Sequence, residues 1–277
     1  MLEISMKSTI TLAALFCMSA SLVQAQGLAD ESFDCVMDPA DIIDVGAPVA
    51  GVLEDVTVRR GNTVAAGQVI ANLESSVERA TIGLLETRAD NNVAIEAQTA
   101  RRDLIMVQRE RTQTLVDRNV ASADQLQEIE AELVTAEALL AQAVLDKEIA
   151  VQELARARQQ LAQRTITSPT EGVVLIRNKS AGEFVATNEA IVSIVRLDPL
   201  LIEAFLPVEL YPAISNGMLA TVAPAAPITD SFQARVIAFD QVFDAASGTF
   251  GVELELPNPG ALLPAGHRCI LTFPTAG

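Results

Sequence analysis

The sequence predicts an α+β protein of several domains: a small β-domain divided by an inserted antiparallel helical hairpin, followed by a small β-barrel. Three observations predict this fold class. A pattern of Pro, Gly and apolar residues occurs twice, and the segment between its two copies has apolar residues at alternating intervals of three and four. The last third of the chain alternates short apolar runs with turn residues, which is typical of short strands.

The repeated pattern predicts the divided β-domain. The first copy is Pro48, Gly51, Gly61, Val64, Ile70 and Leu73, and the second, 121 residues later, is Pro169, Gly172, Gly182, Val185, Ile191 and Ile194. Gly61 and Gly182 stand at expected turns, where only glycine adopts a positive φ without steric cost. Repeats usually follow one another directly, so the separation indicates one domain with an insertion. We expect the halves at residues 42–74 and 165–195.

The insertion, residues 75–164, predicts two long helices. In the second arm a seam runs through Leu126, Ile129, Leu133, Ala136, Leu140, Ala143, Lys147, Ala150, Leu154, Ala157 and Leu161. Only Lys147 interrupts its apolar character, and the spacing is typical of a coiled coil about 60 Å long. The first arm has a looser seam through Ile82, Leu85, Ala89, Val93, Ala97, Ala100, Leu104 and Val107. Neither arm contains Pro or a run of Gly, so we expect no strong kink.

A turn between the arms makes the two helices antiparallel. Residues 119–121 separate the arms, and Ser122 and Gln125 have the spacing of a capping box, which satisfies the first free amides of a new helix. The arms have nearly equal length. We therefore expect a hairpin with its tip near residue 120.

The C-terminal segment, residues 196–277, predicts the β-barrel. Strand-like runs occupy Leu200 to Leu206, Phe232 to Phe239, Phe250 to Leu256 and Cys269 to Phe273, with turn residues between them. Residues 26–41 are expected to pack on this barrel.

The N-terminus has the features of a secretory signal. An apolar stretch from Ile10 to Val23 follows Lys7 and precedes Ala25, so residues 1–25 are expected to be removed after Ala25. A retained anchor is the alternative, although the stretch is shorter than the roughly 20 residues that span a bilayer. The net charge of −17 argues against nucleic-acid binding, which depends on clustered Lys and Arg.

With these parts in order, the chain resembles the periplasmic adaptors, or membrane fusion proteins, of RND-type tripartite efflux pumps. The two halves resemble a biotinyl/lipoyl-like domain. Further matching residues are Asp198-Pro199-Leu200 and the segments Val252 to Pro259 and Leu263 to Gly266. Carrier domains hold a modified lysine between the halves, but Leu73-Glu74-Ser75-Ser76 contains none. We therefore expect no cofactor.

The resemblance implies a function and a set of partners. The chain is expected to work in the periplasm and to link an inner-membrane RND-type transporter to a TolC-type outer-membrane channel for export of small molecules. Copies of the chain are expected to form a ring, and the resemblance implies six copies. In that family Arg, Leu and Ser at the hairpin tip dock the channel, and Arg111, Leu115 and Ser122 have the same spacing. The alternative is that Arg111 is a solvated charge, Leu115 a last core contact and Ser122 only a helix cap.

Other functions have weaker support. The only histidine, His267, lies in an expected turn, and neither a Ser-His-Asp set nor a metal-ligand spacing is found, so the sequence does not predict an enzyme. An adaptor for an ABC-type exporter and, with less support, a lipoyl or biotinyl carrier are the alternatives. Compared with larger adaptors, we expect no membrane-proximal domain.

Two cysteines remain after signal removal, Cys35 and Cys269. The periplasm is oxidising, and the family layout starts the chain beside the barrel that contains Cys269. We therefore expect a Cys35–Cys269 disulfide. The alternative is two buried, unpaired thiols.

Overall fold

The computed structural model describes residues 31–273, which form two compact units. One unit comprises residues 31–36, 202–255 and 267–273, and the other comprises Met37–Leu201 and Leu256–Gly266. The expected barrel segment, residues 196–277, is therefore shared between the units. The expected signal peptide lies outside the described residues.

The first unit is the predicted β-barrel. The order of its strands is β1 (Ser32–Gly46), β12 (His267–Thr272), β9 (Leu219–Pro224), β10 (Phe232–Phe239), β11 (Thr249–Leu256) and β8 (Ala190–Pro207), with an additional β1–β8 pairing. Strands β1 and β8 continue into the second unit. The side chains of Phe250 and Leu254 are buried in the barrel core. Tyr211, on the 3-10 helix η2 (Val208–Ala213), packs edge-on against Phe250 with 5.3 Å between ring centroids.

The β-part of the second unit is built from the two sequence repeats. One sheet has the order β5 (Thr165–Thr167), β4 (Val69–Leu73), β2 (Gly51–Val56) and β7 (Phe184–Val185), and a second run pairs β8, β6 (Gly172–Arg177) and β3 (Thr63–Val64). The halves exchange strands, because β7 of the second half pairs with β2 of the first and β3 of the first pairs with β6 of the second. The apolar repeat residues form one core: Val64, Ile70, Leu73, Val185, Ile191 and Ile194 are all buried. The repeat therefore encodes a shared core.

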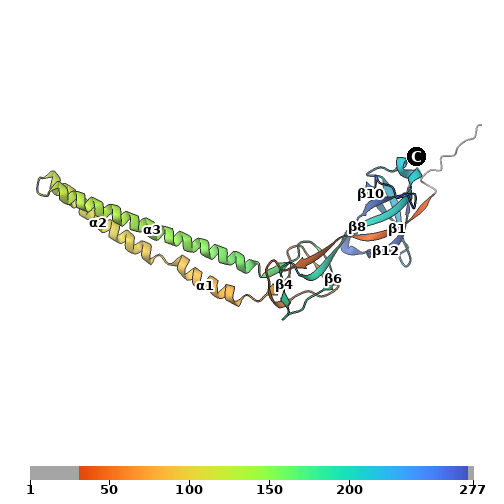
Figure 1. Ribbon diagram of the computed structural model, residues 1–277, viewed down its shortest axis with the longest axis horizontal. Helices are drawn as coiled ribbons and strands as arrows, with labels where there is room; N and C mark the ends of the chain where they lie inside the picture. The colour runs from red at the N-terminus through yellow and green to blue at the C-terminus, as the bar shows by residue number, and fades with distance from the viewer. Residues whose placement is uncertain (1–30, 274–277) are drawn as a thin grey trace, which may run out of the picture. The chain divides into compact units, whose positions relative to one another are not determined.

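Three helices form the predicted hairpin: α1 (Ser76–Asp90), α2 (Val93–Asp117) and α3 (Ala123–Ala162). Figure 1 shows α3 running alongside both α1 and α2. Ion pairs join the arms, with Glu86 2.8 Å from Arg158 and Arg109 3.3 Å from Glu130. From the first pair to the second, the residue number rises in the first arm and falls in α3, so the arms are antiparallel as predicted.

The first arm is not continuous, so the prediction of an unkinked arm was wrong. Helix α1 ends at Asp90, and Asn91 has an extended backbone with ψ 118°. The Asn91 side-chain oxygen accepts a hydrogen bond from the Val93 amide at 2.9 Å, which replaces a bond that a continuous helix would make. Lys147 Nζ on α3 donates a hydrogen bond to the Asn92 side chain. The one polar residue in the α3 seam therefore lies opposite the break.

The break also changes which face of the first arm packs inward. Every predicted seam residue of α3 is at least partly buried, including Lys147. In the first arm Ile82, Leu85 and Ala89 face inward as predicted. After the break the prediction was wrong, because Ile105 is buried whereas the expected seam residues Val93, Ala97, Ala100, Leu104 and Val107 are exposed. The extended backbone of Asn91, followed by Asn92 as the cap of α2, lets α2 begin with a different rotation about its axis.

Candidate functional site at the hairpin tip

The tip is a short turn held by backbone hydrogen bonds. Asn119 has a φ of 58°, in the left-handed region that Asn tolerates better than most residues. Its amide donates to the Val116 carbonyl at 2.8 Å, and the Val120 amide donates to the Leu115 carbonyl at 2.8 Å. These two bonds form a Schellman motif, which satisfies the last carbonyls of α2 and reverses the chain.

Ser122 begins the second arm with the capping box that the sequence predicts. Its hydroxyl oxygen accepts from the Gln125 amide at 3.2 Å, and the Gln125 side chain accepts from the Ser122 amide at 3.3 Å. Asp124 lies in the first turn of α3, where a negative charge interacts favourably with the helix dipole. The turn is therefore fixed at both ends.

Arg111 and Leu115 share one face of α2, because they are four residues apart on a helix. Both side chains are exposed, and within residues 31–273 Arg111 has no ion pair. Val120, which the sequence analysis missed, is 71% exposed in the turn. An apolar residue in a polar turn is the signal that could have identified it. The tip thus presents a cation, apolar side chains and a hydroxyl group.

Cys35 and Cys269 lie on the neighbouring strands β1 and β12 of the barrel unit. The structure has a disulfide between them, with 4.9 Å between the two Cα atoms. This distance is within the range that a disulfide can span. Both side chains are buried.

Local hydrogen bonds and ion pairs shift the pKa of a few titratable groups among the described residues. Hydrogen bonds from Ser76 lower the pKa of Glu74, and the contact between Lys179 and Glu189 raises the pKa of the amine and lowers that of the carboxyl. These groups are at the surface. His267 Nε2 lies 2.8 Å from the Ala225 carbonyl oxygen, a contact within the barrel unit. Among residues 31–273, no group of His, Cys, Asp and Glu has the arrangement of a metal site.

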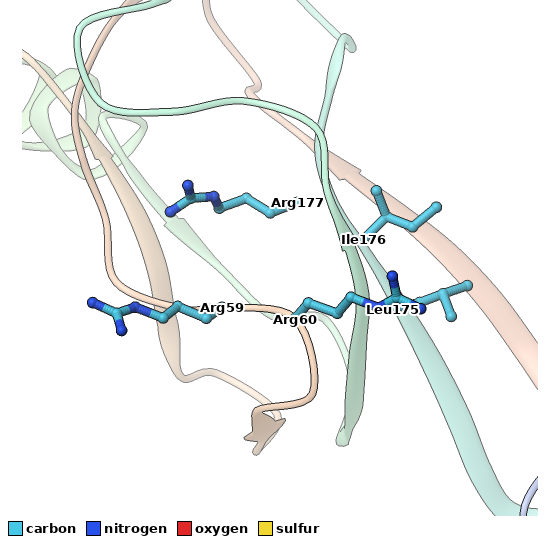
Figure 2. Close-up of a pocket in the computed structure, with 5 residues that line it drawn as sticks. All are labelled: Arg59, Arg60, Leu175, Ile176 and Arg177. Atoms are coloured by element: carbon cyan, nitrogen blue, oxygen red, sulfur yellow. The ribbon is translucent and has the colours of Figure 1, made fainter.

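A second candidate site escaped the sequence analysis. Arg59, Arg60, Leu175, Ile176 and Arg177 line an open pocket on the β-part of the second unit. Figure 2 shows Arg59 and Arg177 extending to the same side, with Arg60 directed toward Leu175 in this view. The residues come from opposite halves of the repeat, which is why their sequence positions give no signal.

Within residues 31–273, none of the helices combines the length and the apolar character that crossing a membrane requires.

Comparison with known proteins identifies the second unit. The family of the CzcB-like, barrel-sandwich hybrid domain matches residues 41–196, which is more than half of the chain. Among solved structures, MacA from Actinobacillus actinomycetemcomitans is 20% identical with a TM-score of 0.72, over 88% of this chain and 78% of MacA. The membrane fusion protein Spr0693 from Streptococcus pneumoniae R6 is 16% identical with a TM-score of 0.55, over 89% of this chain and 100% of Spr0693. A putative efflux transporter from Bacteroides eggerthii DSM 20697 is 19% identical with a TM-score of 0.51, over 87% of this chain and 67% of that one. At these identities the structures establish a shared fold.

Proposed function

We propose a bridging function for this chain, which belongs to the membrane fusion, or periplasmic adaptor, protein family. The family serves tripartite efflux systems and is not enzymatic, so its members act by binding partner proteins. In this proposal the chain links an inner-membrane transporter to a TolC-type outer-membrane channel and supports export of small molecules.

The hairpin tip is the observation that carries the proposal. We assign channel docking to Arg111, Leu115 and Ser122, and we add Val120. A guanidinium group can donate two parallel hydrogen bonds to carboxylates or carbonyls, while exposed apolar side chains fill grooves of a partner. The Schellman turn and the capping box hold the backbone of the tip in one geometry, which reduces the entropy lost on docking.

The inner-membrane partner is proposed to be an RND-type transporter, with an ABC-type exporter as the alternative. The resemblance in sequence supports the RND class. Affinity purification of the adaptor from detergent-solubilised cell envelopes, after cross-linking in cells, tests both parts. We expect one channel and one transporter with two sets of six spans and large periplasmic loops. A transporter with a nucleotide-binding domain would identify the ABC class, and purification without any envelope transporter would contradict the bridging function.

Two outward apolar stripes support a ring of copies. Helix α2 exposes Val93, Ala97, Ala100, Leu104 and Val107, and helix α3 exposes Val134, Ala138, Ala141 and Leu145. Both stripes have coiled-coil spacing. The contacts of Arg109 with Glu130 and of Asn92 with Lys147 show that the stripes cover the same length of hairpin. Packing the α2 stripe of one copy on the α3 stripe of the next is a head-to-tail contact, which can close into a ring.

Cysteine cross-linking tests this packing. Leu104 and Val134 lie at the same level of the hairpin, by the pairing of Arg109 with Glu130, and their side chains are 60% and 66% exposed. We expect the variant Leu104→Cys with Val134→Cys to give a ladder of linked copies on non-reducing gels of cell envelopes. The matched control, Leu104→Cys with Leu145→Cys, places the thiols at different levels. Equal ladders for the two variants, or no ladder, would contradict the proposed contact.

A further inference from the structure

We propose that the pocket formed by Arg59, Arg60, Leu175, Ile176 and Arg177, called here the arginine pocket, binds small amphipathic organic anions. This activity is separate from the bridging of two membrane proteins.

A rigid turn places the first two arginines. The Arg59 amide donates to the Asn62 side-chain oxygen at 2.8 Å, and the Asn62 amide donates back to the Arg59 carbonyl at 3.0 Å. The turn is then attached to β6, because the Gly61 amide donates to the Val174 carbonyl at 2.8 Å and the Val174 amide donates to the Asn62 carbonyl at 2.9 Å. Gly61 has a φ of 82°, which the turn requires.

An irregularity in β6 supplies the other side of the pocket. The pairing of β6 with β8 shifts register between Val174 and Ile176. In a regular strand neighbouring side chains point to opposite faces, but a bulge changes the direction of the side chains that follow it. Leu175, Ile176 and Arg177 are consequently all exposed, the two aliphatic side chains by 37% and 48%.

The charge of the pocket contrasts with that of the chain. Within residues 31–273, none of Arg59, Arg60 and Arg177 has an ion pair, which is also true of other arginines such as Arg101 and Arg111. What distinguishes Arg59, Arg60 and Arg177 is that the fold brings all three to one pocket without a carboxylate partner, although the chain carries a net charge of −17 and offers many carboxylates. Their placement together therefore favours an external anion, which guanidinium groups bind through charge-assisted hydrogen bonds.

The sequence repeat provides an internal comparison. The equivalent turn in the other half is attached in the same way, because the Gly182 amide donates to the Leu53 carbonyl at 2.7 Å and the Leu53 amide donates to the Glu183 carbonyl at 2.9 Å. The register shift also recurs, between Leu53 and Asp55. The residues equivalent to those lining the arginine pocket are Ser180, Ala181, Glu54, Asp55 and Val56. The fold therefore requires neither arginine nor large aliphatic residues at these positions.

The size of the pocket indicates a small molecule. Its volume is about 570 Å³, within the range of small-molecule sites. A stable protein interface buries about 800 Å² on each partner, from some 20 to 30 residues, and five residues do not supply such an area. Exposed Leu175 and Ile176 add apolar surface to the lining, and Figure 2 shows Arg60 directed toward Leu175. An organic anion with an aliphatic part is the ligand class that can contact both the guanidinium groups and the apolar side chains.

Calorimetric titration of the purified full chain with decanoate tests the proposal. We expect decanoate to bind, and Arg177→Glu to weaken binding by about tenfold or more, because a charge-assisted contact is lost and a like charge is added. Ile176→Ser should weaken decanoate binding while leaving the charges unchanged. The control Arg101→Glu makes the same change of charge at an exposed residue of α2 and should bind decanoate as the unmodified chain does.

Two further ligands separate charge from apolar contact. Acetate should bind much more weakly than decanoate, and decyltrimethylammonium should not compete with it. Equal decanoate affinity for Arg177→Glu and Arg101→Glu would overturn the proposal. The absence of decanoate binding would also overturn the proposal. If Arg177→Glu then changes only the sedimentation of the chain, the arginines belong to a contact between copies instead.

Discussion

Replacing Arg111 by Asp is expected to reduce export to the level of a strain without this protein. The Arg111 side chain is exposed at the tip, and it has no ion pair within residues 31–273. In the proposed docking mode its guanidinium group donates to carbonyls or carboxylates of the channel. A carboxylate at this position would repel those acceptors and leave them unpaired, which costs more than loss of the contact alone.

The experiment separates docking from folding and from binding to the transporter. Arg111→Asp should keep the helicity and melting temperature of the unmodified chain, and affinity purification should recover the inner-membrane transporter without the outer-membrane channel. Arg156→Asp is the control, because Arg156 is also exposed and helical but lies on α3 far along the sequence from the tip. Full export by Arg111→Asp, with the channel still recovered, would contradict the docking role.

The second arm of the hairpin could be predicted almost completely from its sequence, and the first could not. In α3 one uninterrupted spacing runs from the cap at Ser122 to Leu161, so a single helix phase satisfies every position. In the first arm two phases compete. The heptad pattern of α2 is real, but it faces outward, because the break at Asn91 and Asn92 resets the rotation. Spacing alone cannot distinguish an inner seam from an outer one.

The polar interruption at Lys147 illustrates the same limit. Its position in the seam was visible in the sequence, but the reason for a lysine there depends on Asn92, more than fifty residues away. The hydrogen bond between Lys147 and Asn92 can stabilise the break between α1 and α2 only after the two arms have paired. Local propensity of Asn91 and Asn92 for non-helical backbone was the available signal, and it is weak within an otherwise helical segment.

The two candidate sites differ in the same way. Arg111, Leu115 and Ser122 are close in sequence and could be found from spacing and a family resemblance. The arginine pocket combines a turn of the first half with a bulged strand of the second, joined by the bonds between Gly61, Asn62 and Val174. Neither the bulge nor the attachment has a sequence signature, so only the structure brings the arginines together.

Removing the disulfide is expected to be the largest single loss of stability in the barrel unit. We predict that Cys35 and Cys269 are linked in the exported protein, closing a loop with a sequence separation of 234 residues. In the chain-entropy model so long a loop gives an upper value of about 5 kcal/mol, which native-state strain would reduce. The double variant Cys35→Ser with Cys269→Ser should therefore melt at a markedly lower temperature, and it should release β1 from β12 first, since the bond joins these two strands.

Thiol titration of the protein from the periplasm, denatured without reductant, tests the bond directly. We expect no free thiol, with the chain still monomeric on a non-reducing gel, whereas reduction should expose two. A double variant that melts as the unmodified chain does would show that hydrogen bonding and the apolar barrel core already hold β1. Two free thiols per chain before reduction would contradict the bridge itself and leave Cys35 and Cys269 as buried neighbours, at 4% and 2% exposure.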